Sequence, residues 1–512
     1  MTRRTRATDP NLSAETGAVP NDHVPPDEEV STGTLASGTR WMVVGRLVTQ
    51  ASRFLVSIIL ARLLTPEAFG IVAVAMTTIL ALEVLKDLGT GSALIQRASV
   101  DQRLISSVFY LNIAMGVLSA GIMALGAPFI AGVFGSPDAA PVVRALSLVL
   151  LIGGLSQTHH AILRRRMNFN AVAAIDMTGA LTTGIVSIAL AVAGLGVWAM
   201  VWGNVAGVVA GTVVALLRSG WQPSATFSPA ALRSIAAFSL NTAAFNLTTF
   251  VLRNSDKVLV GRWLGASPLG IYTLAQRTIS YPVESIAQVL MTVLFPAFSR
   301  LQDDHEALRN GYLRALGAIA FVTLPVMVGA AAVATPLVHT VFGDQWLDLI
   351  PLLWFMAPAG ALAALMSAIN TLYSAKGRAD WMFRWGLASG AFTLLAFAVG
   401  LQWGLLGLAI AYLVAMTVQT PVGLAVAGSL IELPLGRVLR TLTPYLLMTM
   451  TMAAGAWSTA TWIESTGASH PLALAAAVGV GALLYGGTAL LLRPPAVKDV
   501  ARIVTSRRGG GA

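Results

Sequence analysis

The sequence predicts an all-α integral membrane protein with about fourteen transmembrane helices. Three observations support this fold class. First, 56% of the 512 residues are hydrophobic and only 11% are charged, whereas a soluble domain carries about 25% charged residues. Second, apolar stretches recur that have the length of about 20 residues needed to cross a bilayer. Third, Arg and Lys are concentrated in alternate connections between these stretches, which is the pattern of a multi-pass membrane protein.

The apolar stretches are the predicted elements, in chain order. They are continuous and lack the period-two alternation of a membrane β-barrel. In hydrocarbon, backbone polar groups must be satisfied within the segment, so each stretch is expected to be a helix. Their centres lie near residues 52, 79, 118, 152, 183, 207, 248, 282, 325, 361, 391, 414, 450 and 481.

The cations predict the orientation. The N-terminal segment and every second connection after it hold 24 of the 33 Lys and Arg residues. The intervening connections hold none, and only Arg62 and Arg262 lie at their edges. Both termini are therefore expected in the cytoplasm. The net charge of +10 is spread over short loops beside lipid headgroups, which argues against nucleic-acid binding.

The N-terminal tail and the Cys and His content of the chain add little to the functional prediction. Residues 1–37 are rich in Pro, Ser, Thr and acidic residues and are predicted to be a disordered cytoplasmic tail. The absence of Cys excludes thiol chemistry and Cys metal sites. His159 and His160 are adjacent and would point about 100° apart on a helix. They are therefore interpreted as a pair at the cytoplasmic interface, and no metal site is predicted.

An internal repeat appears when the chain is shifted by 200 residues, which aligns 51–79 with 251–279. Six spans separate the matched helices, so the two halves are expected to have the same orientation, as in transporters built from parallel repeats. The identities in and just before this alignment pair Thr49, Arg53, Arg62, Leu64, Gly70, Ile71, Ala75, Thr78 and Ile79 with Thr249, Arg253, Arg262, Leu264, Gly270, Ile271, Ala275, Thr278 and Ile279.

The repeat predicts the domain organisation. Spans 1–6 form an N-lobe at residues 38–220, and spans 7–12 form a C-lobe at residues 228–430. Two further spans follow at 436–492, before a basic cytoplasmic tail at 493–512. Within the sixth span, glycines recur every fourth residue, and such small residues allow close helix packing; they are Gly203, Gly207 and Gly211.

Charged and polar side chains follow one stripe on each of the first two helices of both repeats. An ion at the centre of a bilayer costs about 2.5–3.5 kcal/mol on insertion scales, so these groups are expected to face a shared wet cavity. The cations outnumber the anions, which suits an anionic phosphate group. The stripe residues are Arg46 and Arg53, Glu83, Lys86 and Asp87, Asn246, Arg253, Asp256 and Lys257, and Arg277, Glu284 and Gln288. Two alternatives remain for Arg253, Asp256 and Lys257: an interhelical salt-bridge lock, or a location at the membrane edge.

Several segments carry a family resemblance. "RNSDKVLVGRWLGASPLGIYTLAQRTISYPVESIAQVLMTVLFPAFSRLQ", "LTPEAFGIVAVA" and "DLGTGSALIQR" resemble bacterial polysaccharide flippases of the Wzx type. These belong to the multidrug, oligosaccharidyl-lipid and polysaccharide exporter superfamily. The resemblance covers roughly residues 38–430 and is strongest at 41–100 and 250–301. It implies a V of two six-helix lobes around a basic central cavity.

The resemblance also implies a function. It implies alternating access in the bacterial inner membrane that moves an undecaprenyl-diphosphate-linked oligosaccharide to the outer leaflet. Glycan polymerase and export machinery would be partners, and no cofactor would be needed. Substrate contacts would come from Arg46, Arg53, Arg253, Lys257, Arg277, Asn246 and Gln288. Counter-ions or proton-coupling groups would be Glu83, Lys86, Asp87, Asp256 and Glu284.

Two rival functions predict different sequence features. A drug exporter of the same superfamily is expected to have a more acidic, aromatic pocket for cationic drugs. A membrane glycan polymerase or ligase is expected to have a sizeable outer loop, whereas the outer loops here are only a few residues long. Because no phosphate-binding Gly loop, nucleophile elbow or metal triad is present in the sequence, the protein is predicted to be a transporter and not an enzyme.

Overall fold

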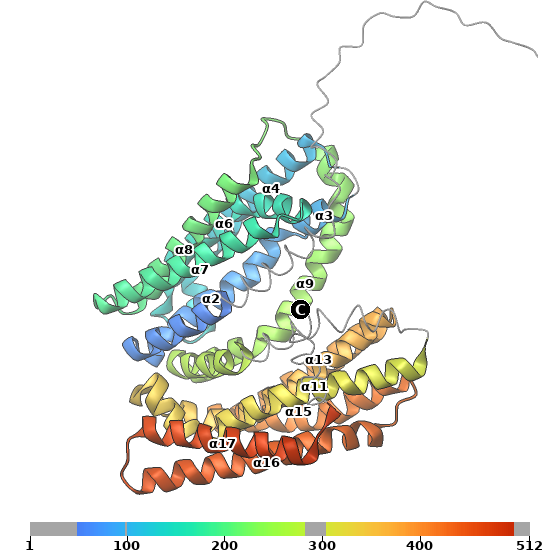
Figure 1. Cartoon of the computed structure of the whole chain (residues 1–512). Helices are drawn as coiled ribbons and strands as arrows, with labels where there is room; N and C mark the ends of the chain where they lie inside the picture. The colour runs from blue at the N-terminus through green and yellow to red at the C-terminus, as the bar shows by residue number, and fades with distance from the viewer. Residues whose placement is uncertain (1–48, 98–99, 282–303, 496–512) are drawn as a thin grey trace, which may run out of the picture.

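The computed structural model describes residues 49–97, 100–281 and 304–495. Within these ranges the chain folds into helices and contains no strand, so the predicted all-α class is confirmed. Figure 1 shows two helical bundles, one above the other, with α9 running between them.

The first bundle, called the N-lobe below, begins with a helix at residues 49–63. Its other helices are α2 (Pro66–Asp87), α3 (Thr90–Gln96), α4 (Gln102–Leu125), α5 (Ala127–Val133), α6 (Ala139–Arg165), α7 (Phe169–Val192) and α8 (Val197–Ser219). Capping residues position several helix starts. Thr65 accepts a hydrogen bond from the Ala68 backbone N–H, and Asp101 accepts one from Leu104, which satisfies amide groups that the first turn leaves unpaired.

The second bundle, called the C-lobe, begins with α9 (Pro229–Leu264) and a helix at residues 266–281. It continues with α11 (His305–Ala332), α12 (Ala334–Leu337), η1 (Val338–Phe342), η2 (Asp344–Trp346), α13 (Leu349–Ala375), α14 (Ala379–Gly400), η3 (Leu401–Trp403) and α15 (Gly404–Ser429). The last two helices, α16 (Leu435–Ser465) and α17 (His470–Leu492), pair with each other and pack through α16 on α11. In Figure 1 they lie on the side of the C-lobe away from the N-lobe.

The length and apolarity of the helices fit a multi-pass membrane protein. Among the described residues, nine segments are long and apolar enough to cross a bilayer, and one of them, 379–429, contains both α14 and α15. The predicted centre near residue 282 lies outside the described residues, as do the tails at 1–37 and 496–512. The count of fourteen spans therefore stays a prediction.

The two lobes meet where α2 crosses the helix at 266–281. A Cβ atom on Gly70 would overlap the carbonyl oxygen of Ala266, and one on Gly270 would overlap that of Pro66. The 200-residue shift of the sequence repeat relates these two contacts, because it pairs Gly70 with Gly270 and Pro66 with Ala266. Only glycine allows such close backbone approach, and the reciprocity supports a two-fold relation between the lobes.

Further contacts join the lobes at the same end of the molecule, called the Trp346 end below. The buried Trp346 indole N–H donates to the Ala61 carbonyl at 2.7 Å, and the Phe69 ring meets Trp346 edge-on with centroids 5.1 Å apart. Arg62 donates through Nε to the Val341 carbonyl at 2.9 Å. The Trp346 end is therefore closed by packing and by hydrogen bonds between the lobes.

The predicted glycine ridge packs α8 on α7. A Cβ atom on Gly207 would lie 2.7 Å from the Gly179 carbonyl oxygen and would overlap the Thr183 hydroxyl. A Cβ atom on Gly203 would lie 2.9 Å from the Cβ of Ser187. The close packing predicted from the fourth-residue spacing is confirmed.

Candidate functional site

A cavity of about 700 Å³ lies along the inner face of the N-lobe and is called the N-lobe cavity below. Its walls are the helix at 49–63 together with α2, α3, α6, α7 and α8. The helix at 266–281 also contributes, through Arg277 and Tyr281. Tyr281 meets Phe54 edge-on, with ring centroids 5.9 Å apart. The cavity therefore lies where the two lobes face each other.

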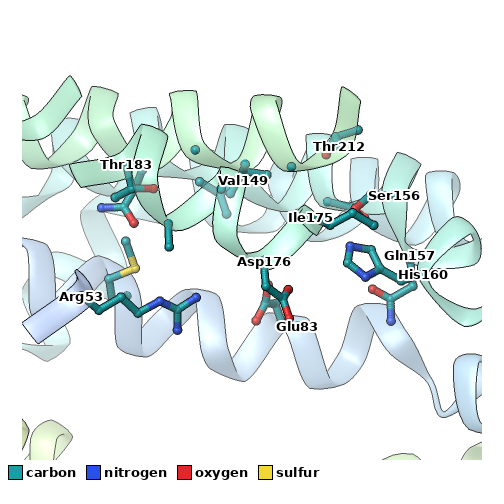
Figure 2. A pocket seen from close by; sticks show the side chains of 18 of the residues that line it. Arg53, Glu83, Val149, Ser156, Gln157, His160, Ile175, Asp176, Thr183 and Thr212 are labelled. Carbon is teal, nitrogen blue, oxygen red and sulfur yellow. The ribbon is translucent and has the colours of Figure 1, made fainter. Parts of the chain in front are cut away.

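The described lining carries seven Lys, Arg, Asp and Glu side chains, with charges of both signs. Four are cations and three are carboxylates: Arg53, Lys86, Arg164 and Arg277, and Glu83, Asp87 and Asp176. With His160 neutral, the described lining has an excess of one positive charge. Figure 2 shows Arg53, Glu83, Asp176, Gln157 and His160 projecting toward one space.

Lys86 is the most deeply buried of these ions. Its side chain is 4% exposed, and its Nζ lies 3.9 Å from Glu83 Oε1. Gly153 of α6 makes room for it, because a Cβ atom there would lie 2.8 Å from Nζ. A buried ammonium is costly unless it is paired. The contact with Glu83 is long, so this ammonium is available to a further anionic partner.

Asp87 links α2 to α6. Its Oδ1 accepts a hydrogen bond of 2.6 Å from Gln157 Nε2. α2 ends directly after Asp87, where Leu88 adopts a φ of 44°. Positive φ is uncommon for a residue other than glycine, so the chain bends sharply beside this carboxylate. The bend and the hydrogen bond together hold Asp87 at the cavity wall.

The structure brings together five of the predicted residues in the N-lobe cavity: Arg53, Glu83, Lys86, Asp87 and Arg277. Arg46, Glu284 and Gln288 lie outside the described residues, and so does the side chain of Arg253. Asn246 and Lys257 are described but are not among the residues that line the N-lobe cavity. Lys257 Nζ instead donates to Asn254 Oδ1 at 2.9 Å.

Asp256 corrects the prediction of one shared cavity. It lines a second cavity of about 800 Å³, called the C-lobe cavity, formed by α9, the helix at 266–281, α13, α14 and α15. The physical reason is that α9 lies between the lobes and contacts both α2 and α14. Opposite faces of α9 therefore point toward different lobes. Thr249 and Asp256, seven residues apart on one face, both line the C-lobe cavity.

Sequence reasoning missed three ionisable residues of the N-lobe cavity. Arg164 lies in the last turn of α6, outside the polar stripes of the first two helices of each repeat. Asp176 is a lone acidic residue in an apolar span, a signal that points to a functional site in a membrane protein. His160 had been assigned to an interface together with His159.

The two histidines in fact face different surroundings. His159 is buried, shares a hydrogen bond of 2.8 Å with the Ser219 hydroxyl and packs edge-on against Phe109 and Trp221. His160 lines the cavity. Rotation of about 100° between adjacent helical residues explains the difference. Among the described residues, no group of three or more His, Asp or Glu side chains is arranged to bind a metal ion.

Residues 59–351 match the model of a family described as polysaccharide biosynthesis protein. The chain is similar to the teichuronic acid biosynthesis protein TuaB of Bacillus subtilis (strain 168), with 28% identity over 89% of this chain and 95% of that protein. It is also similar to the succinoglycan biosynthesis transport protein ExoT of Rhizobium meliloti (strain 1021), with 28% identity over 77% of this chain and 80% of that protein.

Among solved structures, the chain resembles the lipid II flippase MurJ in an inward closed conformation. The TM-score is 0.70, the sequence identity is 15%, and the match covers 88% of this chain and 98% of the other. Identity this low supports the fold alone. The all-helical fold is thus shared with that protein.

Proposed function

Because the chain belongs to the polysaccharide biosynthesis protein family, we propose that it is a flippase for a lipid-linked oligosaccharide. The substrate would be an undecaprenyl-diphosphate-linked glycan, carried from the cytoplasmic to the outer leaflet of the bacterial inner membrane. The relatives' names support a role in surface polysaccharide synthesis, and ExoT is named a transport protein. A glycan polymerase and export machinery would act on the product, and the protein itself would not be an enzyme.

The observation that carries this proposal is the set of four cations in the N-lobe cavity. Arg53, Arg164 and Arg277 present planar guanidinium groups that bind phosphate oxygens through paired hydrogen bonds. Lys86 adds a compact buried charge. A volume of about 700 Å³ accommodates a diphosphate and the first sugars, while the polyprenyl chain would remain in the bilayer.

The carboxylates have a separate role in this proposal. Glu83, Asp87 and Asp176 offset three of the four positive charges and so limit the net charge of the lining. Asp87 accepts a hydrogen bond from Gln157 and so connects α2 to α6 in the cavity wall. A glycan also presents many hydroxyl groups, which carboxylates and amides bind well. Protons taken up by these carboxylates would couple transport to the proton gradient.

Alternating access explains how the substrate would pass. The lobes are closed at the Trp346 end by the Gly70 and Gly270 crossing and by Trp346. The N-lobe cavity extends along α6 to Arg164, close to the opposite end of that helix. With both termini in the cytoplasm, the closed end would face outward and the substrate would enter from inside. Rocking of the lobes would then expose the cavity to the outer leaflet.

The energetics favour such a path. Without a protein, the diphosphate and sugar hydroxyls would lose several kcal/mol for each unsatisfied polar group in hydrocarbon. A lined aqueous cavity removes most of this barrier. An inside-negative potential also favours outward movement of about two negative charges, by about 2.3 kcal/mol per charge per 100 mV.

Export of polysaccharide by cells tests the proposal. In a strain that lacks the chromosomal copy, the full-length chain should restore surface polysaccharide. Arg53→Gln and Arg277→Gln should reduce export strongly. Arg144→Gln is a matched control, because Arg144 is exposed on α6 and does not line the cavity. Equal export by all three variants, at equal membrane levels, would refute the role of the cations.

A further inference from the structure

The line of contact between α11 and α16, called the α11–α16 seam below, carries arginines that the N-lobe cavity does not use. We propose that this seam binds an anionic phospholipid, whose phosphate lies between Arg314 of α11 and Arg440 of α16. Both arginines are near the helix ends that are distant from the Trp346 end, because α11 runs from His305 toward η1 and η2. The site is separate from both cavities and does not depend on the proposed flippase reaction.

Two contacts set the register of α11 against α16. Arg437 Nη2 donates to Asn310 Oδ1 at 3.2 Å. Further along, a Cβ atom on Gly317 would lie 2.8 Å from the Tyr445 hydroxyl oxygen. Residue numbers rise together in the two contacts, so α11 and α16 run in the same direction. Arg314 lies between the two contacts.

Arg314 and Arg440 lie at nearly the same depth along the seam. Arg314 follows Asn310 by four residues, about 6 Å along the helix, and Arg440 follows Arg437 by three residues, about 4.5 Å. The axes of packed helices are about 8–10 Å apart, a distance that two arginine side chains can bridge through one shared anion. Arg314 is on the α11 face that packs on α16 and is nevertheless exposed, as is Arg440. Both guanidinium groups are therefore accessible.

The described carboxylates near the seam do not neutralise these two arginines. Glu432 pairs with Arg309. Glu306 precedes Arg314 by eight residues, about 12 Å along α11. Among the described residues, neither Arg314 nor Arg440 forms a salt bridge with an Asp or Glu side chain. Each can therefore bind phosphate oxygens through paired hydrogen bonds.

The lengths of the two helices favour a lipid phosphate over a phosphate ion from solution. α11 has 28 residues and α16 has 31, which gives lengths of about 42 and 46 Å. The hydrocarbon core is about 30 Å thick, so the first turns of both helices extend to the level of the headgroups. Long arginine side chains reach that level from slightly deeper positions. Basic pockets between transmembrane helices at this level bind anionic headgroups.

An apolar strip on α16 provides a surface for the acyl chains. Leu447 lies seven residues, or two turns, after Arg440 on the same side of α16, and Met450 follows one turn later. Their side chains are 55% and 63% exposed. A lipid with its phosphate at Arg440 would place an acyl chain along this strip, which a soluble phosphate would not contact.

A zwitterionic phospholipid is a weaker occupant. It carries the same phosphate, but its headgroup also bears an ammonium group. Arg437 and Arg440 are on adjacent positions of one α16 face, so this ammonium would meet like charges. Phosphatidylglycerol has an uncharged glycerol headgroup and keeps its net negative charge. Selectivity for phosphatidylglycerol over phosphatidylcholine is therefore the expected property.

The test is native mass spectrometry of the purified full-length protein in detergent, titrated with phosphatidylglycerol. We expect one lipid retained per chain at a concentration at which phosphatidylcholine is not retained. Arg314→Gln combined with Arg440→Gln should weaken binding by about twentyfold or more, since each basic residue near a headgroup contributes roughly fivefold. The matched control is Arg103→Gln combined with Arg218→Gln, which removes the same charge from exposed residues of α4 and α8. It should bind as the wild type does.

Two further arms keep the test decisive. Glycerol phosphate, which has the headgroup without the acyl chains, should compete poorly. If the double variant does not fold, Arg314→Gln alone should weaken binding by about fivefold. Wild-type affinity in the Arg314→Gln variant, equal retention of phosphatidylcholine, or displacement of the lipid by an equal concentration of glycerol phosphate would overturn the proposal.

Discussion

The crossing at Gly270 should control the closed Trp346 end. In Gly270→Ala, the new Cβ would lie 2.8 Å from the Gly70 backbone nitrogen and would overlap the Pro66 carbonyl oxygen. Ordinary Cβ contacts begin at 3.4 Å. The Gly70 nitrogen alone would require a separation of 0.6 Å, the difference between 3.4 and 2.8 Å, and the Pro66 oxygen, which lies closer still, requires more. Both neighbours are backbone atoms, so no side-chain rotation relieves the overlap.

The magnitude follows from the cost of overpacking. Forcing an extra methyl group into a tight contact costs about 1–3 kcal/mol. That cost falls on the closed state alone if the crossing separates when the lobes rock. A shift of about 2 kcal/mol changes a two-state equilibrium by roughly thirtyfold. The open population at the Trp346 end should rise accordingly.

Thiol labelling measures this shift. The chain contains no Cys, so Ala68→Cys introduces a single thiol at the start of α2, where Ala68 is 8% exposed. A membrane-impermeant maleimide should label it slowly in the parent and much faster with Gly270→Ala. Gly486→Ala is the control, because its Cβ meets no atom within 4 Å. Unchanged labelling with Gly270→Ala in a folded protein would refute the proposed closure.

Three further predictions follow from the N-lobe and from the charge of the substrate. Gly207→Val should lower thermal stability by about 1–3 kcal/mol through overlap with Thr183, measured by thermal unfolding in detergent, whereas Gly121→Val, with open space at its Cβ, should be nearly neutral. Asp87→Ala should cost about 1.5–3 kcal/mol by removing the charged hydrogen bond to Gln157, and Asp87→Asn should recover part of it in the same assay. Collapsing an inside-negative potential with an ionophore should slow outward flipping in vesicles, and an unchanged rate would show that the net charge moved is near zero.

Much of the fold could be predicted from the sequence because hydrocarbon imposes simple rules. Long apolar stretches must be helical, and the 200-residue repeat pairs Gly70 with Gly270, which lie at one crossing in the structure. The spacing of Gly203, Gly207 and Gly211 predicted the packing of α8 on α7. These features depend on period and residue size, which a sequence displays directly.

The candidate site was predicted less completely, because the direction in which a side chain points depends on how its helix is rotated within the bundle. Arg53, Lys86 and Arg277 meet in the N-lobe cavity, whereas Asp256 faces the C-lobe cavity. The polar stripe on α9 does not predict that one face of this helix lies toward the N-lobe and another toward the C-lobe. Asp176 lies on α7, outside the first two helices of each repeat on which the polar stripes occur.

Flipping by the purified protein in liposomes tests the central claim most directly. The substrate would be a fluorescent undecaprenyl-diphosphate sugar, and a membrane-impermeant quencher would report the fraction in the outer leaflet. The account predicts fast flipping by the wild type and by Arg144→Gln, and a loss of about tenfold or more with Arg53→Gln combined with Arg277→Gln, since each removes a charge-assisted phosphate contact. Flipping by the double variant at the wild-type rate would contradict it.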